Sequence, residues 1–138
     1  MRYEELKNKH YKETNELPLG FAFDDKQFET MMEKFGLAKD DYASIYSLGS
    51  GCYVKKSDYD LIKQTFDRHK QEHKQEIEND KTGNGYIYQM FAYELANHEY
   101  CITYSLDETL DALDLTEEEI EKNPKLKLGL KKALKKYR

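Results

Sequence analysis

The chain has 138 residues, a length that fits one domain. Charged residues make up 36% of it, and the formal net charge is −5, which argues against a general nucleic-acid binder. Aromatic residues make up 13% of the chain and supply the apolar area of a core, so we expect a folded rather than a disordered protein.

No export signal and no membrane span are expected. The opening segment Met1–Leu6 lacks the apolar stretch of a signal peptide, and no apolar run is long enough to cross a bilayer. The two cysteines, Cys52 and Cys101, do not make a disulfide framework. The sequence therefore predicts reduced thiols and a cytoplasmic location.

The N-terminal part of the chain is polar and ends in a turn. Residues 1–18 are expected to form a short amphipathic helix or an ordered arm, because their apolar residues are sparse. A second helix is expected after Asp24 or Asp25, either of which can accept the free N–H groups of a first turn. Gly36 stands where a left-handed residue would end this helix.

The middle of the chain combines a hairpin with a long helix. Two β-favouring runs flank Gly49–Gly51 and predict a β-hairpin around residues 44–55. A helix over 58–78 follows, opened by a variant capping box that begins at Ser57. Residues 79–85 are the clearest loop of the chain.

The C-terminal half is expected to hold the central helix. Residues 86–98 are apolar on nearly all faces, which is typical of a buried helix. Residues 100–104 are β-branched and aromatic and suggest a short strand, and helices are expected over 107–113, from Thr116 and from Pro124. The predicted fold is a mostly helical α+β single domain spanning residues 1–138 with one small β-hairpin.

Histidines lie on the apolar stripe of the helix over 58–78. His69 and His73 are four residues apart, so both imidazoles project from adjacent turns of one face. The central helix carries a matching pair, Glu94 and His98, and Cys101 follows three residues later. If the two helices pack, these five side chains could converge, and zinc accepts nitrogen, oxygen and thiolate donors in tetrahedral geometry. The sequence therefore suggests a zinc site.

Two other interpretations of the histidines stay open. They can be core side chains that are satisfied by Glu94 and by tyrosine hydroxyls. A site with three protein ligands and a bound water, with Glu94 or Glu72 as the base, would instead make a metal-dependent hydrolase. The segment Arg68–His73 does not read H-E-x-x-H, and four or five available ligands favour a structural ion.

Charge is polarised in the C-terminal third. Residues 107–121 are rich in acids and residues 122–138 are rich in lysine, which can reflect helix-dipole complementarity. Alternatively, the acids form a surface for a basic partner, or the lysines contact nucleic acid. The acidic residues proposed to contact a partner are Asp107, Glu108, Asp111, Asp114, Glu117 and Glu118.

Several segments resemble a family of small uncharacterised proteins from phages and mobile elements of Gram-positive bacteria. These segments are Leu19–Phe23, Ile45–Gly51, Phe66–His69 and Tyr93–Tyr100, and the likeness runs from about residue 19 to the C-terminus. That family has no settled activity, so the resemblance implies no catalytic residues. It implies an accessory protein expressed in the cytoplasm of a bacterial host.

Small acidic proteins in that setting are often inhibitors of host defence, and anti-CRISPR proteins that block an RNA-guided nuclease are one class of them. By analogy, we expect a stoichiometric protein-binding inhibitor rather than an enzyme. The expected partner is a host protein with a basic surface, such as an RNA-guided nuclease, with no membrane and no direct nucleic-acid binding. A metal-dependent hydrolase and a nucleic-acid binder that uses the C-terminal lysines are the alternatives.

Overall fold

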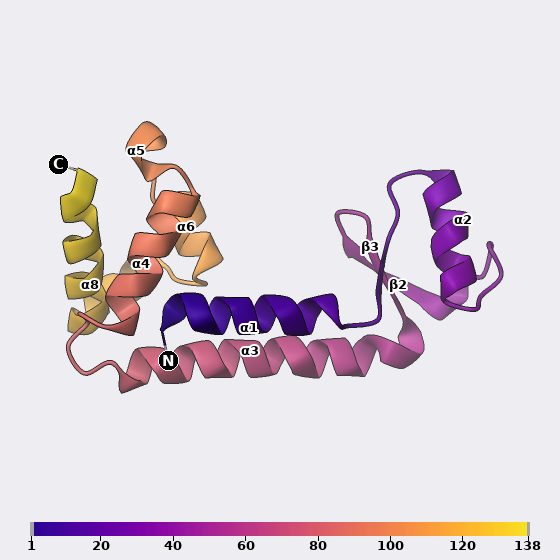
Figure 1. The fold of residues 1–138 in the computed structure, drawn as a ribbon, viewed down its shortest axis with the longest axis horizontal. Helices are drawn as coiled ribbons and strands as arrows, with labels where there is room; N and C mark the ends of the chain where they lie inside the picture. The colour runs from indigo at the N-terminus through magenta and orange to yellow at the C-terminus, as the bar shows by residue number, and fades with distance from the viewer. Residues whose placement is uncertain (1, 138) are drawn as a thin grey trace. The chain divides into compact units, whose positions relative to one another are not determined.

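A computed structural model describes residues 2–137 and shows the mostly helical α+β fold that the sequence predicts (Figure 1). The three strands are β1 (Leu19–Phe21), β2 (Ile45–Gly49) and β3 (Cys52–Lys55). The helices are α1 (Tyr3–Asn15), α2 (Asp25–Lys34), α3 (Tyr59–Asn79), α4 (Tyr86–Asn97), α5 (Tyr100–Thr103), α6 (Asp107–Ala112), α7 (Glu117–Lys122) and α8 (Pro124–Leu134). No helix within residues 2–137 is both long enough and apolar enough to cross a membrane.

The chain divides into two compact units, and each is described by itself. We call Lys12–Lys70 the sheet unit. The helical unit consists of Met1–Tyr11 together with Gln71–Arg138. Helices α1 and α3 contribute residues to both units, and the single-domain organisation stays a prediction.

The sheet unit contains the predicted hairpin. Strands β2 and β3 pair antiparallel, with Ile45 opposite Lys55, and β1 pairs with the other edge of β3, so that the order is β1-β3-β2. The turn between β2 and β3 needs left-handed backbone, and Gly49 and Gly51 supply it with φ values of 91° and 76°. The hairpin prediction around residues 44–55 is therefore confirmed, and β1 extends it to a three-stranded sheet.

Helix α2 covers the sheet and begins where the sequence predicts. Asp24 is its N-cap, and the carboxylate accepts a hydrogen bond from the Gln27 N–H at 2.7 Å. The small core between helix and sheet centres on Met31 and Met32. Strand β1 passes close to α2 at Gly20, where an added Cβ would lie 2.5 Å from Met31 Cγ.

The helical unit is built around α4, as its all-round apolar pattern predicts. Ile87, Met90, Phe91 and Leu95 of this helix are fully buried in the larger core. Helix α8 approaches α4 closely at Gly129, where an added Cβ would meet Ile87 Cγ2 at 2.5 Å and the Gly83 carbonyl oxygen at 2.9 Å. Side-chain volume at this crossing is therefore limited by backbone as well as by side chains.

Two local predictions are wrong. The strand suggested over residues 100–104 is instead the short helix α5, bounded on both sides by left-handed residues, Glu99 and Tyr104. Ile102 in this segment is 71% exposed, whereas β-favouring residues form strands when they pack on a half-buried sheet surface. Phe66, assigned to the buried stripe of α3, is 37% exposed.

The predicted loop over 79–85 is organised by one carboxylate. Asp80 accepts hydrogen bonds from the N–H groups of Thr82, Gly83, Gly85 and Ile87 at 3.0–3.2 Å. It thereby satisfies orphan donors at the start of α4. Burial raises the pKa of the Asp80 carboxyl, but the four N–H donors together outweigh it, so that the pKa lies below its usual value of 3.8.

Asp80→Asn is expected to lower the free energy of unfolding by about 1 kcal/mol at neutral pH, because an amide has one acceptor oxygen and no charge. The folded-state pKa is depressed, so this contribution is full above the unfolded pKa of 3.8 and is lost as pH falls through the folded pKa. Urea denaturation of both proteins, followed by circular dichroism from neutral to acid pH, measures the difference. A difference that stays constant at low pH would contradict this account, and exposed Asp40→Asn is the control.

Candidate functional site

A buried carboxylate lies at the centre of the helical unit. The Glu94 side chain is 0% exposed; it accepts a hydrogen bond from the Tyr3 hydroxyl at 2.8 Å and forms an ion pair with Lys7. His98 Nε2 lies 3.4 Å from the second carboxylate oxygen. A buried charge is costly unless it is paired and hydrogen-bonded, and Glu94 has both kinds of contact. We call Glu94, Tyr3, Lys7 and His98 the Glu94 cluster.

Glu94 and His98 lie side by side, as their i, i+4 spacing predicts. A further contact links His98 to the surface of the unit. His98 Nδ1 lies 3.4 Å from the Glu108 carboxylate, whose side chain is largely exposed. The Thr109 hydroxyl donates to the Glu94 carbonyl oxygen at 3.3 Å. These contacts attach α6 to α4, so the cluster ties three helices of the unit together.

Tyrosine hydroxyls in this unit keep their protons. Burial first, and then the hydrogen bond to the Glu94 carboxylate, raise the pKa of Tyr3 far above its usual value of 10.0. Burial likewise raises the pKa of Tyr86. Both residues are therefore hydrogen-bond donors at any physiological pH.

His73 contacts one of these tyrosines and not the Glu94 carboxylate. Its Nδ1 lies 2.5 Å from the Tyr86 hydroxyl. Burial and the nearby His10 lower the pKa of His73 below 6.5, so the imidazole is neutral at neutral pH. Its Nδ1 therefore accepts a hydrogen bond from the Tyr86 hydroxyl. The Tyr3 ring packs edge-on against both side chains.

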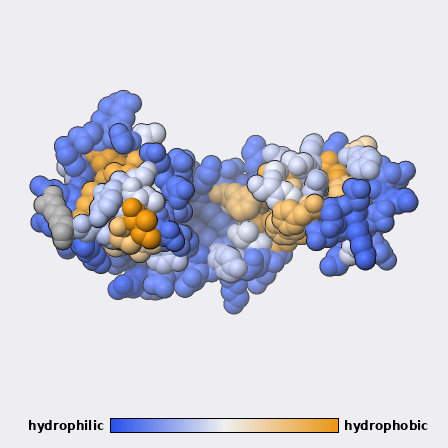
Figure 2. Space-filling model, turned by 90° about the horizontal axis from the view of Figure 1, so that it is seen from above, coloured by the Kyte–Doolittle hydropathy of each residue, from blue (hydrophilic) through white to orange (hydrophobic). Residues whose placement is uncertain are grey.

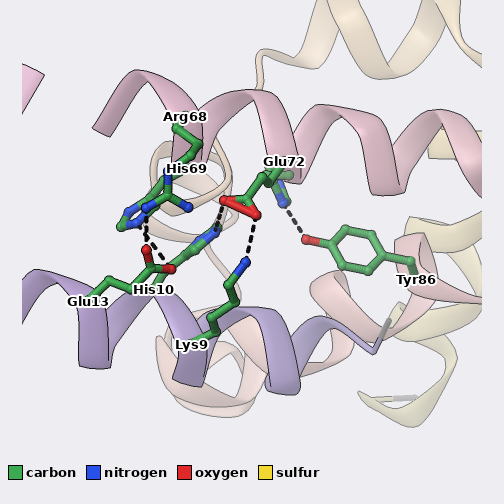
Figure 3. A network of polar contacts seen from close by, with 8 residues as sticks. Lys9, His10, Glu13, Arg68, His69, Glu72 and Tyr86 are labelled. Carbon is green, nitrogen blue, oxygen red and sulfur yellow. Dashed lines mark hydrogen bonds and ion pairs between the residues drawn. The ribbon is translucent and has the colours of Figure 1, made fainter. Parts of the chain in front are cut away.

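The other predicted histidine, His69, belongs to the sheet unit and is buried there. Its Nε2 lies 3.8 Å from the Glu13 carboxylate, which also pairs with Arg68 (Figure 3). In the helical unit, Lys9 and His10 face Glu72 in the same manner (Figure 3). The partners named by the core interpretation, Glu94 and a tyrosine hydroxyl, lie beside His98 and His73, whereas His69 lies beside Glu13 instead.

The four suggested zinc ligands of the helical unit, His73, Glu94, His98 and Cys101, are not gathered at one point. Glu94 and His98 are adjacent, whereas His73 contacts Tyr86, and Cys101 is an exposed free thiol of α5. Within residues 2–137, no three His, Cys, Asp or Glu side chains are arranged to hold a metal ion. Zinc binding itself stays a prediction.

Sequence reasoning missed Tyr3 and Lys7. Both lie on α1, in a segment for which the sequence suggested a short amphipathic helix or an ordered arm, and the structure shows the helix. Their spacing of four residues places them on one face of a helix, which was the available signal. Their partner, Glu94, is 91 and 87 residues away along the chain.

The acidic residues predicted to contact a partner are all exposed on and beside α6 and α7. Two of the six lie beside basic side chains: Glu108 faces His98, and Glu118 pairs with Lys122 at 2.7 Å. Asp107, Asp111 and Glu117 form no ion pair with any residue of 2–137. We call these six residues the acidic face; they are Asp107, Glu108, Asp111, Asp114, Glu117 and Glu118.

The C-terminal lysines are partly engaged within the unit. The Nζ atoms of Lys132 and Lys136 lie 4.9 Å and 5.3 Å from the centre of the Tyr88 ring. This cation–π geometry stabilises α8 against α4 at the surface. Two of the four lysines considered as a nucleic-acid surface therefore already have an aromatic partner in the fold.

The sheet unit exposes an unusual number of aromatic side chains. Phe23 is 75% exposed and Tyr42 is 66% exposed, and Phe21, Tyr46 and Tyr59 are exposed as well. Figure 2 shows apolar residues (orange) beside residues of intermediate hydropathy (white) over the region of the sheet and α2. Exposed apolar patches of this kind mark interaction surfaces in soluble proteins.

Comparison with known proteins gives one positive result. No curated protein and no solved structure matches the chain significantly. The model of one protein family matches residues 2–136, which is almost the whole sequence. The chain therefore belongs to DUF7659, a family of unknown function.

Proposed function

We propose that this protein acts by stoichiometric binding, with its acidic face docked on a basic surface of a partner protein. Charge complementarity between two such surfaces accelerates association and selects the partner. The proposal rests on one observation: two carboxylates of the acidic face lie at the C-terminal end of α6, where the helix dipole disfavours negative charge.

Helix dipoles account for only part of the acidic face. Asp107 and Glu108 lie in the first turn of α6, and Glu117 and Glu118 in the first turn of α7, where negative charge is favourable. Asp111 lies in the last turn of α6 and Asp114 just beyond its end, where the dipole disfavours a carboxylate. Asp111 also has no ion pair within residues 2–137. Asp114 adopts the left-handed backbone that follows α6 and interacts electrostatically with His73, so it is Asp111 that gains from a cationic partner a role that folding does not give it.

The finer form of the proposal names the partner. The resemblance to phage and mobile-element proteins suggests an anti-CRISPR-like inhibitor that acts in the cytoplasm of a bacterial host. RNA-guided nucleases hold their nucleic acids in a positively charged channel. An acidic face that occupies this channel would compete with the phosphate backbone and block cleavage.

A double charge reversal tests the proposal. Asp111→Lys with Asp114→Lys is expected to weaken partner binding by at least about ten-fold, since two attractive contacts become repulsive. Folding should be little changed, because lysine is favourable at the end of α6 but adopts the left-handed backbone of residue 114 (φ 56°) less readily than aspartate does. The matched control is Glu29→Lys with Glu33→Lys, two exposed acids of α2 that give the same change in net charge.

The readout is DNA cleavage by a panel of purified RNA-guided nucleases with increasing amounts of wild-type protein or variant. Inhibition by wild type and control, but not by the acidic-face variant, is the expected result. Equal inhibition by all three proteins would reject the acidic face as the contact surface. If no nuclease is inhibited by the wild-type protein, the finer proposal fails, and pull-down of basic host proteins tests the general one.

A further inference from the structure

The sheet unit contains a cavity of about 690 Å³ between the start of α2 and the sheet. Its walls combine two kinds of side chain. Four are aromatic and two are acidic: Phe23, Phe28, Tyr42, Tyr53, Asp24 and Asp25. Neither the acidic face nor the Glu94 cluster contributes to it, since both lie in the helical unit.

The aromatic walls are held in place although two of them are exposed. The Phe28 ring lies 5.7 Å from the Tyr42 ring and 5.4 Å from the Tyr53 ring, so these three rings support one another. Phe23 sits directly over the hairpin turn, where an added Cβ on Gly51 would lie 2.5 Å from its ring. The cavity therefore presents fixed aromatic faces to solvent, and partner binding would bury them.

The acidic side chains at the cavity lie at the N-terminus of α2, where the helix dipole favours negative charge, but no cationic side chain within residues 2–137 neutralises them. One Asp24 oxygen accepts the Gln27 N–H, which fixes the orientation of that carboxylate. Neither Asp24 nor Asp25 forms an ion pair with any residue of 2–137. Negative charge beside aromatic faces is the environment that a cationic side chain favours.

We propose that this cavity binds an arginine side chain on an exposed segment of a partner protein. The planar guanidinium stacks on aromatic rings and donates two parallel hydrogen bonds to a carboxylate, whereas an ammonium ion does only part of this. The volume lies within the range of about 300–1,000 Å³ that is typical of ligand sites, so residues that flank the arginine are accommodated as well. This inference rests on the proposed function, because it supplies a second contact to a basic partner.

The test uses the full chain labelled with ¹⁵N and a blocked peptide of glycine and serine with one central arginine. Amide shifts that saturate and that centre on Phe23, Asp25 and Tyr42 are expected. The matching lysine peptide should bind about five-fold more weakly, since it loses stacking and the second hydrogen bond. The citrulline peptide has nearly the same shape as the arginine peptide but no charge, and it should give no saturable shifts.

Substitutions at exposed positions separate the cavity from the fold. Tyr42→Leu and Asp25→Asn are each expected to weaken binding of the arginine peptide by about five- to ten-fold, through loss of one ring face or one charge. Glu29→Gln, an exposed acid of α2 that does not line the cavity, should leave binding unchanged. Unshifted amides in the rest of each spectrum show that the variant is folded.

Several results would overturn the inference. These are no saturable shifts, equal shifts with the citrulline peptide, or shifts confined to α6 and α7. Shifts at the cavity on concentrating the protein alone would identify a second copy of the chain as the occupant instead. The variant with Asp111→Lys and Asp114→Lys should still bind the peptide, so failure of the acidic face and failure of the cavity are distinguished.

Discussion

Replacing Glu94 by alanine is expected to lower the free energy of unfolding by about 3–5 kcal/mol, the cost of breaking a buried ion pair by removing one partner. The substitution leaves Lys7 and His98 without their carboxylate, and the Tyr3 hydroxyl loses its acceptor. It also opens a cavity at a fully buried position. Each loss alone is unfavourable, and all three occur at one site.

Two matched variants separate these contributions. Glu94→Gln keeps the volume and one acceptor oxygen, so it isolates the loss of charge and should cost less than alanine. Glu108→Ala removes only the exposed outer member of the chain of contacts and should change stability by less than about 0.5 kcal/mol. Urea midpoints followed by circular dichroism, at unchanged slope, give the comparison. A loss of under about 1 kcal/mol for Glu94→Ala would show that the Glu94 cluster is not a structural centre.

Gly129→Ala is expected to destabilise the protein by about 2 kcal/mol, although alanine is the better helix former by about 1 kcal/mol. The added methyl would overlap Ile87, which is fully buried, and the Gly83 carbonyl oxygen, which belongs to the backbone. Neither neighbour can move aside without shifting α8 away from α4.

The sign of the change in urea midpoint for Gly129→Ala decides this prediction. Lys131→Ala, at an exposed position of the same helix, should change stability by no more than about 0.5 kcal/mol. If Gly129→Ala raises the midpoint, helix propensity outweighs packing, and the close approach of the two helices has little energetic weight.

Local sequence patterns correctly predicted the helices and strands that are determined by interactions between neighbouring residues. The hairpin follows from two β-favouring runs around Gly49 and Gly51, and the start of α2 follows from Asp24 as its cap. The central position of α4 follows from its composition. The strand prediction for residues 100–104 is wrong because β propensity takes effect only beside a neighbouring strand. The sheet of the described chain lies within residues 19–55.

The candidate sites depended on contacts that no local pattern encodes. The sequence placed Glu94 and His98 on one face and suggested a metal as their cationic partner, whereas Lys7 supplies a positive charge at this carboxylate. The aromatic cavity was missed for a related reason. A sequence shows that a side chain such as Phe28 is apolar, but it does not show whether another element covers that side chain.

The division of the helical unit along the chain affects the order of its folding during synthesis. Its first segment, residues 2–11, leaves the ribosome before the whole sheet unit, and the core that receives it follows only after residue 71. The sheet unit is continuous in sequence and can fold while translation proceeds. Tyr3 and Lys7 can form their contacts only after Glu94 has been synthesised. The helical unit is thus completed only after its second segment has been made, by long-range contacts that are slow to form.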